Sequence, residues 1–371
     1  MRSKLLFAAL AIAACAGFAD DISKWDPRMA VDNAVVSNDV KWIDGKFLPI
    51  EGRMYDDVTD YYDRLPQLTA NVNGGVHAMR HHTSGMMFRF KTNSRKLVFK
   101  WIPYNENLAM DHMPATGVSG IDVYGFDKKK GKWLYKATGR IRDAKAGGNL
   151  QVWWQAGDEC LVNLPLYNGL KAFSLGIDTN ATIEALGPRK SGVDRPVVFY
   201  GTSITHGGCA SRPGLAFVNR IGRDLDVPVV GLGFSGSGLM EYALSDVIGR
   251  IDASCYVLDC LWNMNDIQWK NNYEPFIRNL RKKRPTTPII MAGRCDFKGL
   301  GWGYERTEVS TKKLYEKLIA EGWKDLHFLP KDDMLGDDFE GTVDGVHPND
   351  LGMERLAKTY GKAVKEALKL K

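Results

Sequence analysis

Three residues in the C-terminal half of the chain have the types needed for nucleophilic catalysis. Ser203 ends the segment Gly201-Thr202-Ser203, and Asp344 precedes His347 in the segment Asp344-Gly345-Val346-His347. A serine hydroxyl is a weak nucleophile by itself, and acyl transfer requires a base that takes its proton. We expect His347 to be that base and Asp344 to hold the imidazole in the productive tautomer. Together the three residues predict a serine hydrolase.

Acyl transfer also requires donors that hold the developing oxyanion. The sequence offers the backbone N–H groups of Ser203 and Gly236 and the side-chain amide of Asn263. Gly236 lies in the glycine-rich segment 233–238, where missing side chains let backbone N–H groups approach a reacting oxygen. Asn265 is an alternative to Asn263 as the side-chain donor.

Each of these residues also has a purely structural interpretation. Gly236 could be required only for a positive φ angle, and Ser203 could lie in an ordinary turn. Asn263 could cap a helix, and Asp344 could stabilise a turn with His347 exposed beside it. Their order along the chain favours the catalytic interpretation, because each follows a predicted strand or precedes the last predicted helix.

Three further histidines are weaker candidates for chemistry. His206 is a rival base because it lies three residues after Ser203, but we expect it to point along the helix that follows. His81 and His82 are adjacent, and adjacent residues on a strand point to opposite faces, so they cannot readily share one metal ion. We expect these two in a solvated loop, and we predict no metal and no organic cofactor.

Other residues are candidates for substrate contacts. Cys209 and Arg212 lie on the loop after Ser203, where they either line the pocket or have a structural role. Aromatic faces suit the apolar side of a sugar ring, so Tyr104 and the pair Trp153-Trp154 could form a stacking platform. Most of these aromatic residues are nevertheless expected to belong to a core.

The elements that must position Ser203 and His347 alternate between strands and helices after residue 192. Strands are predicted at 197–200, 227–232, 255–259, 288–292 and 326–329. Helices are predicted near 214–225, 239–250, 272–284, 308–321 and 350–370. This alternation predicts an α/β fold whose parallel sheet is covered on both faces. Ligands of such sheets bind beyond the carboxyl ends of the strands, where the candidate residues lie.

The residues before 187 follow a different pattern. Short runs such as 85–90 and 96–101 alternate apolar with other residues and are separated by turn signals. They predict an antiparallel β-sandwich of jelly-roll type. The Gly- and Pro-containing segment 187–192 is typical of a linker. We therefore predict a β-sandwich accessory domain over 20–190 and a catalytic domain over 191–371.

The C-terminal half resembles the SGNH or GDSL hydrolases, whose conserved blocks supply Ser, Gly, Asn and His in that order. The resemblance covers about residues 196–371 and implies a flavodoxin-like fold with three layers. It implies a nucleophile, two oxyanion donors, an acid and a base at Ser203, Gly236, Asn263, Asp344 and His347.

Two positions depart from that family. Thr202 stands where the family often has Asp, and Leu261 stands where a glycine usually precedes the asparagine by two positions, so Asn265 stays an alternative. The N-terminal half is similar to the β-sandwich found ahead of such domains in a group of bacterial secreted hydrolases. Residues 120–124, Gly-Ile-Asp-Val-Tyr, match that group's Gly-x-Asp-Leu-Tyr signature closely.

The first residues have the three-part layout of a secretory signal. Two basic residues precede an apolar run over 5–14, which is too short to span a bilayer, and small residues follow. We favour a signal peptide over 1–19 with cleavage before Asp20. The segment 12–15 also resembles a lipoprotein box, so a surface lipoprotein is the alternative, and membrane contact is expected only with a lipidated Cys15.

Composition excludes several other classes of protein. Hydrophobic residues make up 44% and charged residues 25% of 371 residues, which is ordinary globular usage. The net charge of +6 is modest and no basic stripe with interleaved aromatic residues occurs, so no nucleic-acid partner is expected. The cysteines have no metal-ligand spacing and do not suggest a disulfide framework.

We therefore predict a secreted or periplasmic serine esterase, with O-acetyl groups on a carbohydrate as the favoured substrate. A lipid-directed lipase or thioesterase is the nearest alternative. A glycan-binding protein with an inactive hydrolase domain is an alternative of a different class. The identity of the alcohol, the acyl length and the oligomeric state do not follow from the sequence.

Overall fold

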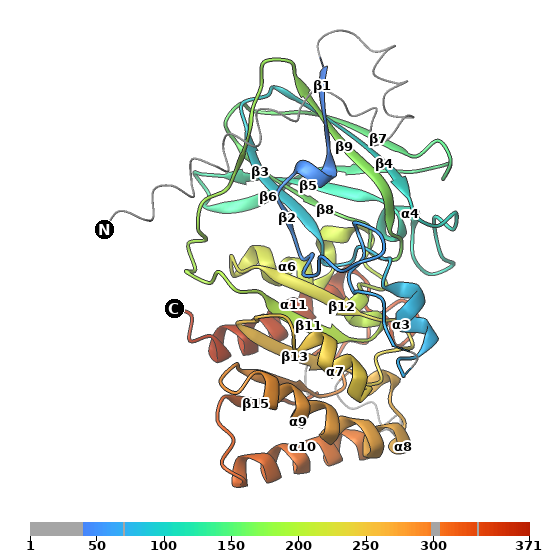
Figure 1. Ribbon diagram of the computed structural model, residues 1–371, viewed down its shortest axis with the longest axis vertical. Coiled ribbons are helices and arrows are strands. Elements are labelled where there is room, and N and C mark those ends of the chain that lie inside the picture. The colour runs from blue at the N-terminus through green and yellow to red at the C-terminus, as the bar shows by residue number, and fades with distance from the viewer. Residues whose placement is uncertain (1–39, 70, 298–304, 332–333) are drawn as a thin grey trace.

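The computed structural model describes residues 40–69, 71–297, 305–331 and 334–371. The predicted signal peptide and the alternative lipoprotein box lie outside the described residues. Antiparallel strands from the N-terminal part lie above the helices and parallel strands of the C-terminal part in Figure 1. No helix within the described ranges combines the length and the apolar character that a membrane span requires.

The described residues of the N-terminal part form ten strands and three short helical segments. The strands are β1 Val40–Asp44, β2 Ile50–Glu51, β3 Met87–Thr92, β4 Lys96–Pro103, β5 Ile121–Asp127, β6 Lys132–Gly139, β7 Gly148–Trp153, β8 Glu159–Asn163, β9 Leu170–Asp178 and β10 Ile183–Ala185. The helical segments are η2 Gly45–Phe47, α3 Gly74–Met79 and α4 Ala115–Val118.

These strands form two antiparallel sheets. One sheet has the order β1-β9-β4-β7, and the other has the order β10-β3-β8-β5-β6 with β2 paired to β3. Alternate side chains point inward from both sheets, and Phe88, Phe99 and Phe173 are among the buried residues of their common core. The predicted antiparallel β-sandwich is confirmed.

The C-terminal part contains one parallel sheet. Its strands are β11 Val197–Gly201, β12 Val229–Gly233, β13 Cys255–Asp259, β14 Ile289–Ala292 and β15 Leu326–Leu329. They are paired in the order β12-β11-β13-β14-β15. This is the 2-1-3-4-5 order of flavodoxin-like folds, in which the ligand crevice lies where the strand order reverses. The predicted parallel sheet is confirmed, and every predicted strand overlaps an observed one.

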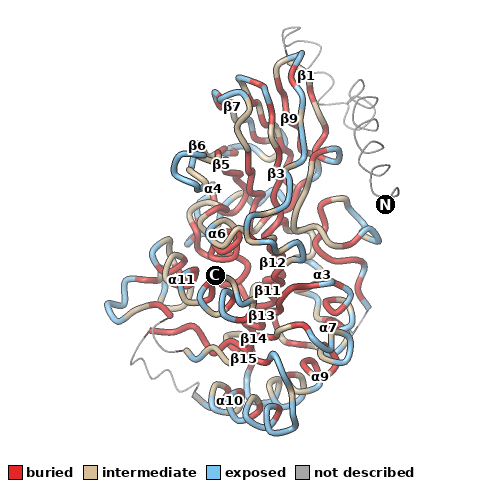
Figure 2. Tube along the Cα trace, turned by 90° about the vertical axis from the view of Figure 1, so that its left-hand side faces the viewer, coloured by how far each residue is buried: buried red, intermediate tan, exposed pale blue. Residues whose placement is uncertain are grey.

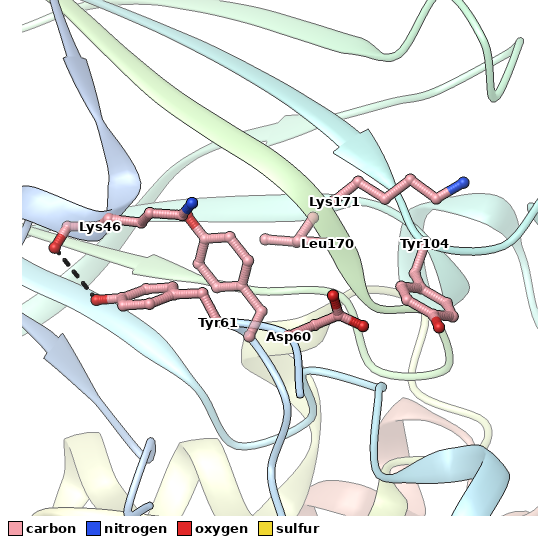
Figure 3. A pocket seen from close by; sticks show the side chains of 7 residues that line it. Lys46, Asp60, Tyr61, Tyr104, Leu170 and Lys171 are labelled. Carbon is pink, nitrogen blue, oxygen red and sulfur yellow. Dashed lines mark hydrogen bonds between the residues drawn. The ribbon is translucent and has the colours of Figure 1, made fainter. Parts of the chain in front are cut away.

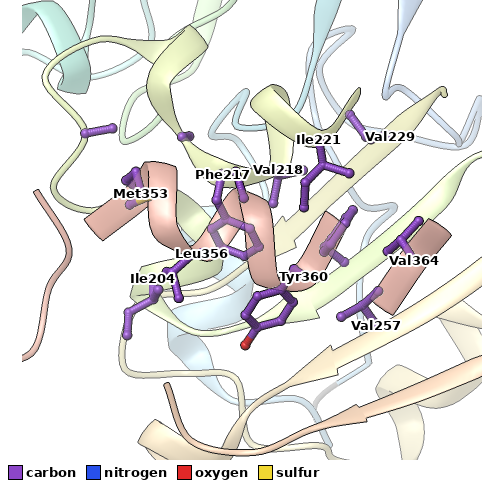
Figure 4. Packing of buried hydrophobic residues seen from close by; sticks show 14 of the residues in the cluster. Ile204, Phe217, Val218, Ile221, Val229, Val257, Met353, Leu356, Tyr360 and Val364 are labelled. Carbon is purple, nitrogen blue, oxygen red and sulfur yellow. The ribbon is translucent and has the colours of Figure 1, made fainter. Parts of the chain in front are cut away.

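Helices cover both faces of this sheet. They are α5 Ser203–His206, η3 Pro213–Leu215, α6 Phe217–Asp224, α7 Tyr242–Ile248, η4 Leu261–Asn263, α8 Asp266–Gln268, η5 Trp269–Tyr273, α9 Glu274–Lys283, α10 Glu305–Ala320 and α11 Asp350–Ala367. Phe199 of β11 packs with α6 and α11, whereas the next residue, Tyr200, packs with α7, α9 and α10. Figure 4 shows Phe217 of α6 beside Leu356 and Tyr360 of α11.

The two parts of the chain share a hydrophobic core. Met113, Val118 and Leu166 of the N-terminal part belong to the same buried cluster as Phe217 and Leu356. Buried chain lies on both sides of this junction in Figure 2. The strands of the sandwich therefore do not form a separate globule joined only by the linker.

Polar contacts also fasten the two parts together. Asp122 of β5 is fully buried, and its Oδ2 accepts hydrogen bonds from Arg212 Nη1 and Gly214 N, each at 2.8 Å. Asn163 donates to its other oxygen at 2.7 Å. Arg212 also binds the hydroxyl of Tyr124 at 2.5 Å. Of the two roles considered for Arg212, the structure therefore supports the structural one.

Candidate active site

Ser203 lies where the first strand of the parallel sheet turns into a helix. It is the first residue of α5, directly after β11 and Thr202, whose hydroxyl accepts a bond from Ile204 N. Its side chain is nearly buried, with 6% of the residue exposed. The first N–H groups of a helix have no acceptor within that helix, so the Ser203 N–H remains available as a donor.

His347 lies against Ser203, 144 positions away in sequence. The distance from His347 Nε2 to Ser203 Oγ is 2.9 Å, and the distance from His347 Nδ1 to Asp344 Oδ2 is 2.7 Å. The structure thus brings the three predicted residues into one hydrogen-bonded chain. This is the arrangement in which an acid orients a base that faces a nucleophile.

Asp344 is held in place by the loop that carries it. Its Oδ1 accepts from the backbone N–H groups of Val346 and His347 at 2.9 and 2.7 Å. Partial burial raises the pKa of Asp344, but hydrogen bonds from His347 and Val346 outweigh this and lower the pKa below its ordinary value. The carboxylate therefore stays ionised at neutral pH and can stabilise an imidazolium.

The predicted oxyanion donors lie on two neighbouring segments. Gly236 is exposed and has a φ of 65°, which favours glycine, in the turn that follows β12. Asn263 ends η4, after β13, and its Oδ1 accepts from Gly238 N at 3.2 Å. This bond leaves the Asn263 amide hydrogens free to donate and fixes the side chain to the turn of Gly236.

Asn265, the alternative donor, is engaged elsewhere. Its side chain accepts from Gln268 N, while the Gln268 side chain accepts from Asn265 N, so the pair forms a capping box at the start of α8. The geometry favours Asn263 over Asn265 as the side-chain donor.

His206, the rival base, is buried away from solvent. Its ring stacks on Tyr167 with centroids 4.1 Å apart, and its Nε2 lies 3.1 Å from His82 Nδ1. Burial, followed by the charge of Arg64, lowers the pKa of His206 well below its ordinary value. The ring is thus a neutral part of the junction between the two halves of the chain.

His81 and His82 lie in a loop, as expected, but the expectation that this loop is solvated is wrong. His81 pairs with Asp63 at 2.6 Å, and burial lowers the pKa of His82 to about 3. His82 lies at the junction, because the segment before β3 packs against His206 of α5 instead of extending into solvent. A single sequence does not reveal such a contact between distant segments.

Tyr167 is a site neighbour that sequence reasoning missed. It lies in the loop between β8 and β9, and its hydroxyl donates to the Ser203 carbonyl oxygen at 2.9 Å. A residue of the sandwich thereby holds the backbone of the candidate nucleophile. Its position depends on how the two halves pack, so no local pattern indicated it.

His112 is a second missed neighbour. It is exposed on the loop between β4 and α4, and its ring lies edge-on to that of His347 with centroids 5.4 Å apart. The N-terminal part therefore contributes a side chain that contacts the candidate base. The sequence around His112 has no motif that would have singled it out.

The aromatic residues proposed as a sugar platform are divided between core and surface. Trp154 is buried, whereas Trp153 is 77% exposed. Tyr104 lines a cavity of about 550 Å³ together with Asp60, Tyr61 and Lys171, as Figure 3 shows. One face of Tyr104 is stacked on His81, with centroids 4.4 Å apart. The three aromatic residues do not form one continuous platform.

Two family models match the chain. Residues 194–365 match that of the GDSL-like lipase/acylhydrolase family. Residues 40–183 match that of the N-terminus of SGNH-hydrolase-type esterases. No curated protein matches the chain in sequence.

Several solved structures share the whole architecture. A GDSL-like lipase from Bacteroides ovatus is 29% identical, with a TM-score of 0.79, and the match covers 90% of this chain and 99% of that one. The salicylyl-acyltransferase SsfX3 of a tetracycline biosynthetic pathway is 18% identical, with a TM-score of 0.70 and coverages of 91% and 100%.

A family two carbohydrate esterase from Cellvibrio japonicus is 12% identical, with a TM-score of 0.58, and the match covers 89% of this chain and 98% of that one. At these identities the likeness to the acyltransferase and to the carbohydrate esterase concerns the fold alone.

Proposed function

We propose that this chain is an exported serine esterase that removes acetyl groups from a carbohydrate. The chain joins the N-terminal domain of SGNH-type esterases to a GDSL-like lipase/acylhydrolase domain, and it is therefore a carboxylic-ester hydrolase. The observation that carries this proposal is the hydrogen-bonded chain from Asp344 through His347 to Ser203. An intact chain of this kind argues against an inactive glycan-binding protein.

In the proposed reaction, the Ser203 oxygen attacks the carbonyl carbon of the ester while its proton passes to His347 Nε2. The Ser203 and Gly236 N–H groups and the Asn263 amide donate to the oxyanion that forms. The imidazolium, stabilised by Asp344, then returns the proton to the departing alcohol oxygen. A water molecule repeats the sequence on the acyl-serine and releases acetate and free Ser203.

The carbohydrate preference has separate support. The fold is shared with a family two carbohydrate esterase, and the sequence begins with the pattern of an export signal. Export would bring the enzyme into contact with acetylated polysaccharides outside the cytoplasm. A lipase remains an outcome of the test below, since the same chemistry cleaves longer acyl esters.

The experiment compares wild type with Ser203→Ala on p-nitrophenyl acetate. We expect the substitution to lower kcat by about 10⁴-fold or more, because the nucleophile is lost. Ser254→Ala is the matched control: this buried hydroxyl has no hydrogen-bond partner among the described residues and precedes β13, at the opposite end of the sheet. Absence of turnover by wild type would refute the esterase, and turnover that survives in Ser203→Ala would refute the nucleophile.

The substrate class is tested by a second series. Acetylated oligosaccharides and p-nitrophenyl esters of increasing acyl length are compared by kcat/KM. We expect acetyl esters of carbohydrates to be preferred. A kcat/KM that rises with acyl length would favour the lipid-directed alternative.

A further inference from the structure

His112 brings a third potential metal ligand to the candidate acid and base. One ligand atom each from His112, Asp344 and His347 lies within 4.8 Å of the other two. Two imidazole nitrogens and one carboxylate oxygen are a donor set that Zn²⁺ accepts, often with water in a fourth position. We propose that these three residues bind a divalent transition-metal ion such as Zn²⁺, and that its binding reversibly removes the base of Ser203.

The geometry is compatible with this ion after a small movement. Zinc–nitrogen bonds of about 2.0–2.1 Å place ligands of a tetrahedral ion about 3.3 Å apart. Asp344 Oδ2 and His347 Nδ1 are 2.7 Å apart and would separate by about 0.6 Å to bind one ion. His112, whose exposed side chain lies edge-on to His347, would approach this pair by rotation about its side-chain bonds.

Either nitrogen of His347 leads to the same loss of function. A metal at Nε2 uses the lone pair that must take the serine proton. A metal at Nδ1 displaces the proton shared with Asp344, and in the neutral ring that proton moves to Nε2, which then faces Ser203 as a donor. In both cases the imidazole has no lone pair for Ser203. This inhibitory part of the proposal rests on the proposed role of His347 as the base.

The site joins the two halves of the chain. His112 lies on a loop of the sandwich, whereas Asp344 and His347 precede α11. Asp344 alone would bind zinc no more tightly than any other exposed carboxylate. The second imidazole, which the sandwich contributes, makes the site selective for a transition metal. Mg²⁺ and Ca²⁺ prefer oxygen ligands and are expected to bind far more weakly.

Metal binding is measured first, without reference to activity. Untagged full-length protein is titrated with ZnCl₂ by calorimetry and with Co²⁺ by visible absorption, for wild type, His112→Ala and the control His77→Ala. His77 lies on α3, outside the three-residue cluster. We expect one site in wild type, an affinity at least about tenfold lower in His112→Ala, and no change in His77→Ala. Equal affinity in wild type and His112→Ala, or no binding at about 1 mM zinc, would overturn the site.

Inhibition is measured second, with p-nitrophenyl acetate and each variant compared with its own metal-free rate. We expect zinc to inhibit wild type, a chelator to restore the rate, and the half-inhibiting zinc concentration to rise at least about tenfold in His112→Ala. Zinc binding without loss of turnover would overturn the inhibitory part. If metal-free wild type hydrolyses no ester, the proposed function fails while the titration still decides the metal site.

Discussion

At the scale of single residues, the candidate site is positioned by groups on both sides of the junction. Ser203, His347 and Asp344 follow from residue type, order and place at strand ends, and the structure puts them within hydrogen-bonding distance of one another. Tyr167 and His112 could not be predicted in this way. They reach the site only because the sandwich packs against the C-terminal part, and a local sequence pattern does not indicate that packing.

Tyr167→Phe tests the contribution of the sandwich to the site. Loss of the hydrogen bond to the Ser203 carbonyl removes about 1 kcal/mol of positioning energy, so we expect kcat to fall several-fold to about tenfold while KM changes little. Steady-state kinetics on p-nitrophenyl acetate measure both constants. Tyr135→Phe, an exposed tyrosine on β6, is the control. Equal kcat values for wild type and Tyr167→Phe would rule out the positioning role.

Asp259 gives a pH dependence of stability. Burial raises its pKa from 3.8 to about 7, although Thr205 and Tyr360 donate hydrogen bonds that act in the opposite direction. Between pH 4 and 7 the folded chain keeps a proton that the unfolded chain has released. This residue's contribution to stability is therefore present at low pH and falls as pH rises, by at most about 1.4 kcal/mol per pH unit.

The neutral variant Asp259→Asn should lack this dependence. We expect its free energy of unfolding to increase relative to wild type between pH 5 and pH 8, measured by urea denaturation at both values. Asp56→Asn, at a fully exposed side chain, is the control and should follow wild type. Parallel pH profiles for wild type and Asp259→Asn would contradict the raised pKa.

At the scale of elements, the parallel sheet was the most predictable part. Strands buried on both faces appear in the sequence as short apolar runs, and those at 197–200 and 255–259 correspond to β11 and β13. The segment before β3 was not predictable, because His81 and His82 are polar by type. Their burial depends on Asp63 and His206, which no local pattern connects to them.

Asp122 on β5 joins an element of the sandwich to the loop after Ser203. Asp122→Asn replaces an acceptor with an amide that faces the donors Arg212 and Gly214. Breaking a buried charge pair costs about 3–5 kcal/mol, so we expect a matching loss in the free energy of unfolding, measured in urea.

Asp127→Asn is the matched control, because this partly exposed carboxylate ends the same strand and accepts hydrogen bonds from the neighbouring backbone N–H groups of Lys129 and Lys130. Its unfolding midpoint should stay near that of wild type. A similar midpoint in Asp122→Asn would show that the carboxylate is dispensable at the junction.

At the scale of the whole molecule, the division into two parts was predicted, but the close packing of the two parts against each other was not. Gly85 and Gly231 illustrate the difference: a Cβ on Gly85, whose φ is 81°, would lie 2.4 Å from Gly231 N. The prediction of two domains did not include a shared core, yet several apolar residues of the sandwich complete the core beneath α6 and α11.

Residues 191–371 expressed alone should therefore not fold stably. Removal of the sandwich exposes apolar surface around Phe217. It also removes Arg64, whose guanidinium donates hydrogen bonds to the carbonyl oxygens of Gly231 and Gly233 on β12. We expect binding of a hydrophobic dye and a loss of cooperative unfolding, measured by fluorescence and circular dichroism against the full chain. Cooperative unfolding with wild-type activity in the fragment would contradict a shared core.

The shared core also limits how such a protein can evolve or be recombined. Recombination within the segment 187–192 would join each half to the other half of a different protein. The two surfaces would not be complementary, so both halves would lose packing at the junction. Insertions are better tolerated at the tip of the hairpin between β5 and β6, where a Cβ on Gly131 would meet nothing within 4 Å. New modules are thus more readily acquired at that tip than exchanged at the linker.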